Sequence, residues 1–179
     1  MNQFMSRHVC CLTISPLLAV LLIANAMAAD ARERHHRAVE EIRRLGGQVD
    51  TIPREAKRSS IRRTELWRTV VWLTDAWQGG DDGLRHLADL HNLRELFLER
   101  ALITDDGLKD EALTAFRDKP NLFELTLVGA SFTDQSLSHT LDIPRLFRLR
   151  LIDTNTTPSA ITTTKQKRPG LQFLSETNP

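Results

Sequence analysis

The most regular hydrophobic pattern in this chain is a repeat in its second half. Three segments begin with Leu-x-x-Leu-x-Leu and continue through a small residue, a threonine and another apolar residue: LRELFLERALITDDGL, LFELTLVGASFTDQSL and LFRLRLIDTNTTPSAI. They start at Leu93, Leu122 and Leu146, and a fragment, LQFL, starts at Leu171, which gives spacings of 29, 24 and 25 residues. Self-similarity at such a period predicts a solenoid of stacked repeats.

Each repeat is expected to hold one strand and one helical crossover. The second and third leucines of a repeat are two residues apart, so they point to the same side of a strand. Stacked strands form a parallel sheet, and each parallel pair needs a crossover between its strands. The inward leucines are Leu96 with Leu98, Leu125 with Leu127, and Leu149 with Leu151. Candidate helix caps in the crossovers are Thr104 or Asp105, and Thr133 or Asp134. The small positions at the turns are Ala101, Ala130 and Thr154.

The ends of the array are less regular. Residues 70–73 predict the first strand, and Leu84, Leu87 and Leu90 follow at steps of three, like the buried side of a short helix. Five extra residues in the second repeat are expected to extend its outer helix. The last repeat predicts an irregular outer segment, because threonines replace apolar or helix-forming residues at Thr156, Thr162, Thr163 and Thr164.

A helix and a strand are predicted ahead of the array. Residues 30–45 carry apolar side chains at helical spacing, and Gly46 and Gly47 then end the helix. Residues 48–52 alternate like a short strand, which Pro53 stops. These elements would cover the apolar end of a solenoid, as terminal units must for solubility. The chain thus divides into a cap and connection over residues 30–68 and about four repeats over 69–179.

Charge is unevenly placed along the chain. Residues 30–68 hold 11 basic and 7 acidic residues, a net charge of +4. Residues 69–179 hold 12 basic and 16 acidic residues, a net charge of −4. The basic stretch 54–68, with Trp67 near its end, could bind an anionic polymer. Two glutamates interrupt it and no nucleic-acid motif is present, so a solvated connection is the favoured interpretation and nucleic acid an unfavoured partner.

The first residues predict a secretory signal peptide. Residues 9–24 are mostly apolar and Ala26-Met27-Ala28 forms a small-x-small cleavage site, so residues 1–29 would be removed. An uncleaved membrane anchor is the alternative. Both cysteines, Cys10 and Cys11, lie in this segment and precede most of the apolar run, which argues against lipidation. Export to the periplasm, the envelope or the exterior is therefore expected, with a mature chain free of cysteine.

The repeats resemble the leucine-rich repeat family, in its ribonuclease-inhibitor-like type. The resemblance lies in an I-T-D-x-G-L segment, present here as ITDDGL and FTDQSL, and the helix followed by Leu-Gly-Gly is similar to short exported bacterial proteins with such repeats. It implies parallel strands on a concave face and short helices on the outer face. It also implies a protein-binding role through exposed strand residues. These candidate residues are Glu95, Glu124 and Arg148; Phe97, Thr126 and Arg150; and Glu99, Val128 and Ile152.

A second candidate surface is the C-terminal edge. The final strand, Leu171-Gln172-Phe173-Leu174, is followed by five residues only, and an unpaired edge invites another chain to pair with it. Self-association as a structural envelope protein is therefore the alternative function.

Catalysis is not expected. The histidines are scattered, with His35 and His36 adjacent and His86 and His91 five apart, and neither spacing matches a zinc-binding helix. The chain has no nucleophile elbow, no glycine-rich phosphate loop and no cysteine-based metal spacing. The sequence predicts a non-enzymatic binding module without cofactor or metal.

Overall fold

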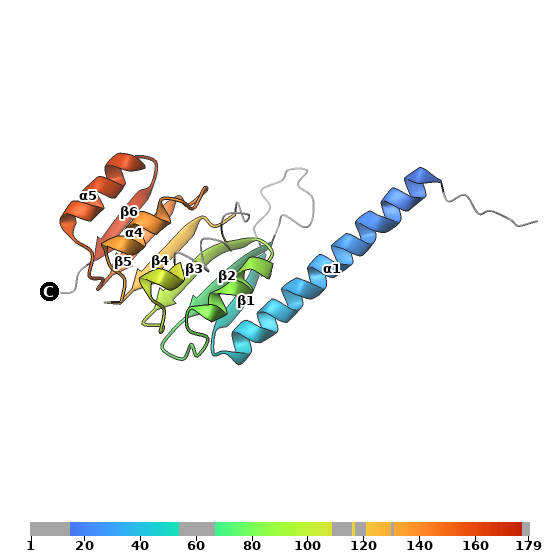
Figure 1. The fold of residues 1–179 in the computed structure, drawn as a ribbon, viewed down its shortest axis with the longest axis horizontal. Helices are drawn as coiled ribbons and strands as arrows, with labels where there is room; N and C mark the ends of the chain where they lie inside the picture. The colour runs from blue at the N-terminus through green and yellow to red at the C-terminus, as the bar shows by residue number, and fades with distance from the viewer. Residues whose placement is uncertain (1–14, 54–66, 109–115, 117–120, 130, 177–179) are drawn as a thin grey trace, which may run out of the picture. The chain divides into compact units, whose positions relative to one another are not determined.

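The computed structural model describes residues 15–53, 67–108, 116, 121–129 and 131–176 (Figure 1). The chain divides into two compact units, Met1–Glu33 and Arg34–Pro179, and helix α1 (Pro16–Arg44) contributes to both. The predicted helix over 30–45 therefore begins earlier, because apolar and alanine-rich residues of good helix propensity precede it. In the described residues no helix is long and apolar enough to cross a membrane. Both cysteines lie outside the described residues, and the signal peptide stays a prediction.

The second unit is built on a six-stranded, mostly parallel sheet. Its strands lie side by side in chain order, and only the first pair is antiparallel. The four remaining pairs are parallel, so a crossover separates each strand from the next. The strands are β1 (Gln48–Pro53), β2 (Trp67–Leu73), β3 (Leu93–Glu99), β4 (Glu124–Val128), β5 (Arg148–Ile152) and β6 (Gln172–Glu176).

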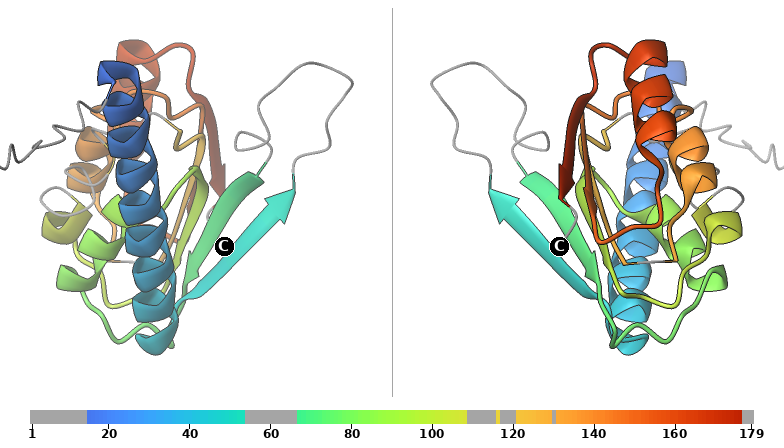
Figure 2. Two further views of the ribbon diagram at one scale, coloured as in Figure 1. Left: turned by 90° about the vertical axis from the view of Figure 1, so that its right-hand side faces the viewer. Right: turned by 90° about the vertical axis from the view of Figure 1, so that its left-hand side faces the viewer.

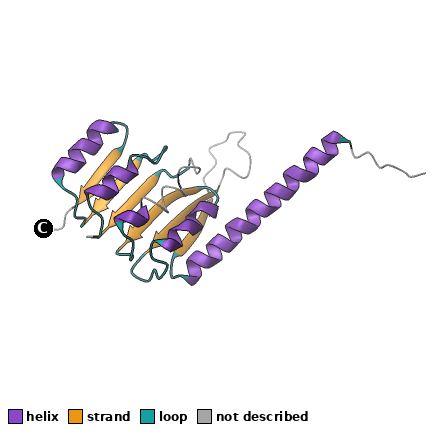
Figure 3. Ribbon diagram, viewed as in Figure 1, coloured by secondary structure: helices purple, strands orange, loops and turns teal. Residues whose placement is uncertain are grey.

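The crossovers of this unit carry their helices on one face of the sheet. Figures 2 and 3 show the described helical segments gathered on that face, while the opposite face carries none of them. These segments are the 3₁₀ helix η2 (Asp82–Asp89) and the α-helices α2 (Asp105–Gly107), α4 (Asp134–Thr140) and α5 (Pro158–Lys167). We call the helix-free face the open face. The unit is thus an α/β layer pair, as the sequence predicts at this coarse level.

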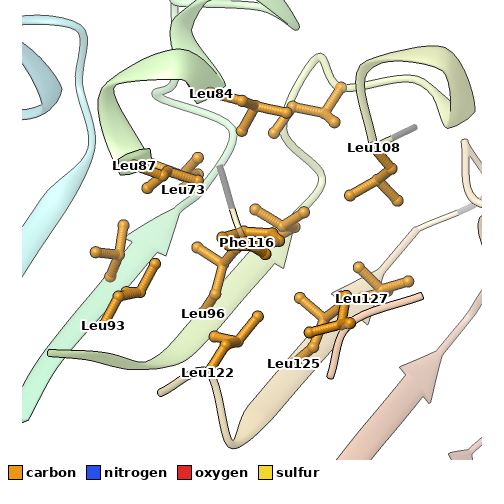
Figure 4. Close-up of a cluster of buried hydrophobic side chains, with 14 of the residues drawn as sticks. Leu73, Leu84, Leu87, Leu93, Leu96, Leu108, Phe116, Leu122, Leu125 and Leu127 are labelled. Carbon is orange, nitrogen blue, oxygen red and sulfur yellow. The ribbon is translucent and has the colours of Figure 1, made fainter. Parts of the chain in front are cut away.

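The core lies between the sheet and the helices. The predicted inward leucines of β3, β4 and β5 are all at most 1% exposed, and they form one apolar cluster with the helix residues above them (Figure 4). The prediction of a buried side at steps of three is confirmed, because Leu84, Leu87 and Leu90 are at most 1% exposed and the helix has three residues per turn. Each buried leucine contributes about 1.5–3 kcal/mol relative to an exposed one.

The N-terminal elements of the second unit cover the β2 end of this core. Ala38 and Ile42 of α1 and Val49 of β1 are buried in the same cluster. The helix ends as predicted: Gly46 has a φ of +90°, and a side chain there would collide with the carbonyl oxygen of Ala76. The helix and the strand predicted ahead of the repeats are thus both present, and their role as the cap of a solenoid stays a prediction. Residues 54–66 of the basic connection lie outside the described residues.

Hydrogen bonds between an aspartate and a threonine join successive crossovers. Each aspartate accepts both the backbone N–H and the hydroxyl of a threonine in the next repeat, at 2.8 and 2.6 Å for Asp81 with Thr104. The same pair of bonds joins Asp105 to Thr133 and Asp134 to Thr157. Each threonine also accepts a hydrogen bond from the start of its own helix. Threonine is thus the cap, and aspartate is the link between repeats.

The junction at Asp105 has one additional bond. The Ser136 hydroxyl donates to its carboxylate, whereas Gly107 occupies the equivalent place beside Asp81, where a Cβ would overlap Asp81 Oδ1. Burial raises the pKa of Asp105, but the hydrogen bonds from Ser136 and Thr133 outweigh it and hold that pKa below its usual value. The bonds therefore favour the charged carboxylate in the folded protein.

The prediction of an irregular outer segment in the last repeat is wrong. Helix α5 spans ten residues, with Thr157 as its cap and Pro158 in its first turn. The hydroxyls of Thr162 and Thr163 donate to carbonyl oxygens four residues earlier, which lets threonine fit a helix. Local capping and proline at the first turn thus outweigh the modest propensity of threonine.

Arg168, just after α5, closes the C-terminal end of α4. Its guanidinium donates to four carbonyl oxygens, the shortest bond being 2.7 Å to Ile143, and burial lowers its pKa. Arginine near a helix C-terminus can hydrogen-bond the last carbonyl oxygens in this way. Two further expectations, the small position Ala130 and the extension of the second outer helix through residues 109–115, lie outside the described residues.

Candidate functional site

The register of the sheet brings the predicted binding residues together on the open face. Residues of β3, β4 and β5 that alternate with the buried leucines line up across the strands. The three rows, in strand order, are Glu95, Glu124 and Arg148; Phe97, Thr126 and Arg150; and Glu99, Val128 and Ile152. The predicted columns are confirmed as neighbours in the sheet, and their role in binding stays a prediction.

The middle row begins one strand earlier, at Trp72. Trp72 is the register partner of Phe97, and the two rings are stacked with centroids 5.5 Å apart and planes 11° from parallel. Both side chains are half-buried. Sequence reasoning missed Trp72, although its place between the buried Val71 and Leu73 could have revealed it. A flat aromatic surface therefore occupies the β2–β3 part of the open face.

Ion pairs run along the row beside this aromatic pair. Arg68 lies 2.9 Å from Glu95, and Arg148 lies 2.8 Å from Glu124, each between guanidinium and carboxylate atoms. Arg150, in the middle row, lies 3.9 Å from Glu176 of β6. Pairs of this kind across neighbouring strands contribute modestly to stability and fix which charges face outward.

Two of the predicted exposed residues are buried. Glu124 is 8% exposed and Thr126 only 3%. Thr126 is short and lies in register between Phe97 and Arg150, whose longer side chains flank it. Glu124 is held against Arg148. The accessible surface of this face therefore belongs to the longer side chains around Thr126. The expectation that the columns are exposed is wrong at Glu124 and Thr126.

Two buried polar atoms of the middle row make no hydrogen bond within the described part of the chain. They are Oγ1 of Thr126 and Nε of Arg150, which belong to register partners on β4 and β5. A buried polar group without a hydrogen bond costs about 1–3 kcal/mol. These two atoms could therefore hydrogen-bond a partner that binds beside the aromatic pair.

The last strand lies later in the chain than predicted, since the sequence predicts residues Leu171–Leu174 and β6 spans Gln172–Glu176. Leu171 is buried as expected, but Phe173, and not Leu174, pairs with Leu149. The Gln172 N–H donates to the carbonyl oxygen of Phe147 at 2.7 Å, and this bond sets the register. Leu174 consequently points to the open face beside Arg150 and is 46% exposed. In the described sheet β6 pairs with β5 alone.

The histidines that seemed scattered in sequence are partly brought together. His35 of α1 and His91, just before β3, stack with ring centroids 5.0 Å apart, and the His91 N–H donates to His35 Nδ1. Within the described residues, no group of three or more His, Cys, Asp or Glu side chains is placed to hold a metal ion. The stacked histidines therefore act here as a contact between α1 and the turn before β3.

Comparison with known proteins gives no relative from which a role could be transferred. No protein-family model matches the sequence, and a search of curated proteins finds no match. The site must therefore be judged on its own geometry.

Proposed function

We propose that this chain is a short leucine-rich-repeat solenoid of the ribonuclease-inhibitor-like type, with a non-enzymatic role in binding another protein. Three features support the fold assignment. The strands follow one another in chain order, their inward leucines are buried, and each crossover begins with a threonine bonded to the preceding repeat. These are the properties that stacked repeats of one supersecondary unit require.

The binding site is the middle row of the open face, from Trp72 to Arg150. The observation that carries this proposal is the stacked, half-buried Trp72–Phe97 pair on a face that carries no described helix. Aromatic residues and arginine are the usual anchors of protein interfaces, because they offer much contact area with few rotatable bonds. Arg150 provides the polar end of the same row, next to Thr126.

The charges around this row favour a partner of mixed charge. Glu95 and Glu124 are each neutralised by an arginine of the same face, so the row is flanked by ion pairs and not by one sign of charge. Charges arranged in this way contribute to specificity, through complementary electrostatic potentials of the two proteins, more than to the affinity of the complex. An exported chain, with residues 1–29 removed, would meet this partner in the periplasm, the envelope or the exterior.

The test is a pull-down from an envelope and extracellular extract with the parent chain and a Phe97→Glu/Arg150→Glu double variant. A matched control, Leu102→Glu/Arg85→Glu, makes the same change of charge at two exposed residues that are not on the strands. Far-ultraviolet circular dichroism must first show that both variants fold. The proposal predicts a partner held by the parent and the control and lost by the double variant. A partner held equally by all three chains contradicts it.

Self-association is the second candidate function, and one observation favours it. Strand β6 pairs only with β5 in the described sheet and carries Leu174 at 46% exposure beside that edge. An edge strand with an exposed apolar residue can pair with a second copy. Sedimentation of the parent beside Leu174→Lys tests it: mass that rises with concentration in the parent and not in the variant supports self-association, and monomers in both contradict it.

A further inference from the structure

A separate groove lies at the start of the strands, outside the rows of the open face. Its volume is about 340 Å³, and it is lined by Arg94, Asn121, Phe123, Arg145 and Phe147. These residues stand directly before or directly after the opening leucine of three successive repeats. A groove of this size accommodates a small group such as one side chain with its neighbour.

Flat groups are stacked along this groove. The guanidinium carbon of Arg94 lies 5.1 Å from the ring centroid of Phe123, and the Phe123 ring stacks on Phe147 with centroids 4.9 Å apart. In the next repeat a glutamine, Gln172, and not an aromatic residue follows the opening leucine, and in the sheet it lies opposite Arg148. Phe147 is 37% exposed, so part of its ring is free to contact another flat group.

Among the described residues, the lining of the groove holds two arginines and no carboxylate. Arg145 is exposed, and within the described residues its side chain makes no hydrogen bond or ion pair. The surrounding sequence has the opposite sign, since residues 69–179 hold 12 basic and 16 acidic residues. The two arginines of the lining favour a ligand that carries a carboxylate.

We propose that this groove binds an acidic peptide segment of another protein in which an aromatic residue stands beside a carboxylate. The aromatic ring extends the stack on Phe147, and the carboxylate pairs with the guanidinium of Arg145. Asn121 also lines the groove, and its amide nitrogen donates a hydrogen bond of 3.0 Å to Asn92 Oδ1. The proposal does not depend on the middle row of the open face, because the two sites share no residue.

The test uses a defined peptide, acetyl-Gly-Glu-Tyr-Glu-Gly-amide, titrated into the full chain by isothermal calorimetry. Two matched peptides replace the tyrosine with alanine or both glutamates with glutamine. The proposal predicts that each replacement weakens binding roughly three- to tenfold, the range expected for losing one stacking or one charged contact. Equal affinity of the three peptides overturns the proposal.

Protein variants locate the binding. Arg145→Gln and Phe147→Leu should each weaken the glutamate–tyrosine peptide roughly three- to tenfold, whereas Arg85→Gln, an exposed arginine on η2, should leave it unchanged. Circular dichroism of each variant checks that the fold is kept. Unchanged affinity in both groove variants overturns the proposal. The proposal is also overturned if an eight-nucleotide oligothymidine binds more tightly than the glutamate–tyrosine peptide and the same two variants weaken its binding. The groove would then be a nucleic-acid site.

Discussion

The two faces of the sheet differ in their side chains: the inner face repeats apolar residues, and the open face varies from strand to strand. In β3, Leu96 and Leu98 are completely buried against the helices, while Phe97 between them is half-buried on the open face. From β2 to β5 the inner face repeats buried aliphatic side chains, strand after strand. The open face changes at every strand, from tryptophan through phenylalanine and threonine to arginine along one row. Repetition on the inner face serves stacking, and variation on the open face leaves room for a specific partner.

Removing a leucine from the inner face should have the largest effect. Leu125→Ala deletes a completely buried side chain at the centre of the sheet, so we expect a loss of about 2–5 kcal/mol in the free energy of unfolding. Phe97→Ala, on the open face, should cost clearly less because the ring is only half-buried. Urea unfolding followed by circular dichroism measures both. Equal losses would mean that the two faces contribute alike to stability.

Removing the link between repeats should have the next largest effect. Asp105→Ala takes away the acceptor for the Thr133 N–H and for the Thr133 and Ser136 hydroxyls, and we expect a loss of about 1–3 kcal/mol. Asp106→Ala is the matched control, since Asp106 is the exposed neighbour in the same helix. The same unfolding experiment serves here. A loss that is no larger for Asp105 than for Asp106 would contradict the role of the junction.

The contribution of Asp105 should depend on pH in a defined direction. Its pKa is lowered in the folded protein: burial raises it, but the bonds from Ser136 and Thr133 outweigh that effect. The charged form thus stabilises the fold above the unfolded pKa of about 4, and this stability is lost as the pH falls through the folded value. The difference in stability between the parent and Asp105→Asn should therefore be constant from pH 7 to 5 and shrink below about pH 4. A difference that grows at low pH would contradict this assignment.

The stacked pair on the open face should show the smallest effect on stability. A double-mutant cycle with Trp72→Leu and Phe97→Leu should give a coupling of about 0.5–1.5 kcal/mol, the usual worth of an aromatic pair beyond its buried area. Both rings should nevertheless matter for partner binding. A coupling near zero would indicate that the rings are adjacent without stabilising one another.

Hydrophobic periodicity was sufficient to predict the strands and their inward side. A leucine spacing of two predicts the buried side of β3, β4 and β5, and their six inward leucines are all buried. In the last repeat, which has only the LQFL fragment, Leu174 is exposed instead. Periodicity could not predict α5, because the Thr157 cap and Pro158 in the first turn favour a helix despite the modest helix propensity of the threonines that follow. Nor could it predict Arg100 and Asp153, which take positive φ at the turn where the middle repeat has Gly129. At that position the stacked neighbours decide the backbone, not the local residue.

For the candidate site, the sequence predicted only which residues are neighbours across the strands. Register followed from the repeat, so Phe97, Thr126 and Arg150 were correctly placed as neighbours. Their exposure was not, because the burial of Thr126 depends on the size of the side chains on either side. Trp72 was missed since it belongs to an irregular first repeat, whose opening leucine is absent. The groove at Arg145 was missed because its residues are adjacent only when three repeats are stacked.

The central claim, that the open face is the binding face, is tested most directly by photocrosslinking. A photoreactive phenylalanine analogue at Phe97 samples the open face, and the same analogue at Thr163 samples the exposed side of α5. Incubation with an envelope and extracellular extract, followed by mass spectrometry of crosslinked species, gives the comparison. The account predicts one protein crosslinked from position 97 and absent from position 163. The same protein captured from position 163 alone would contradict it.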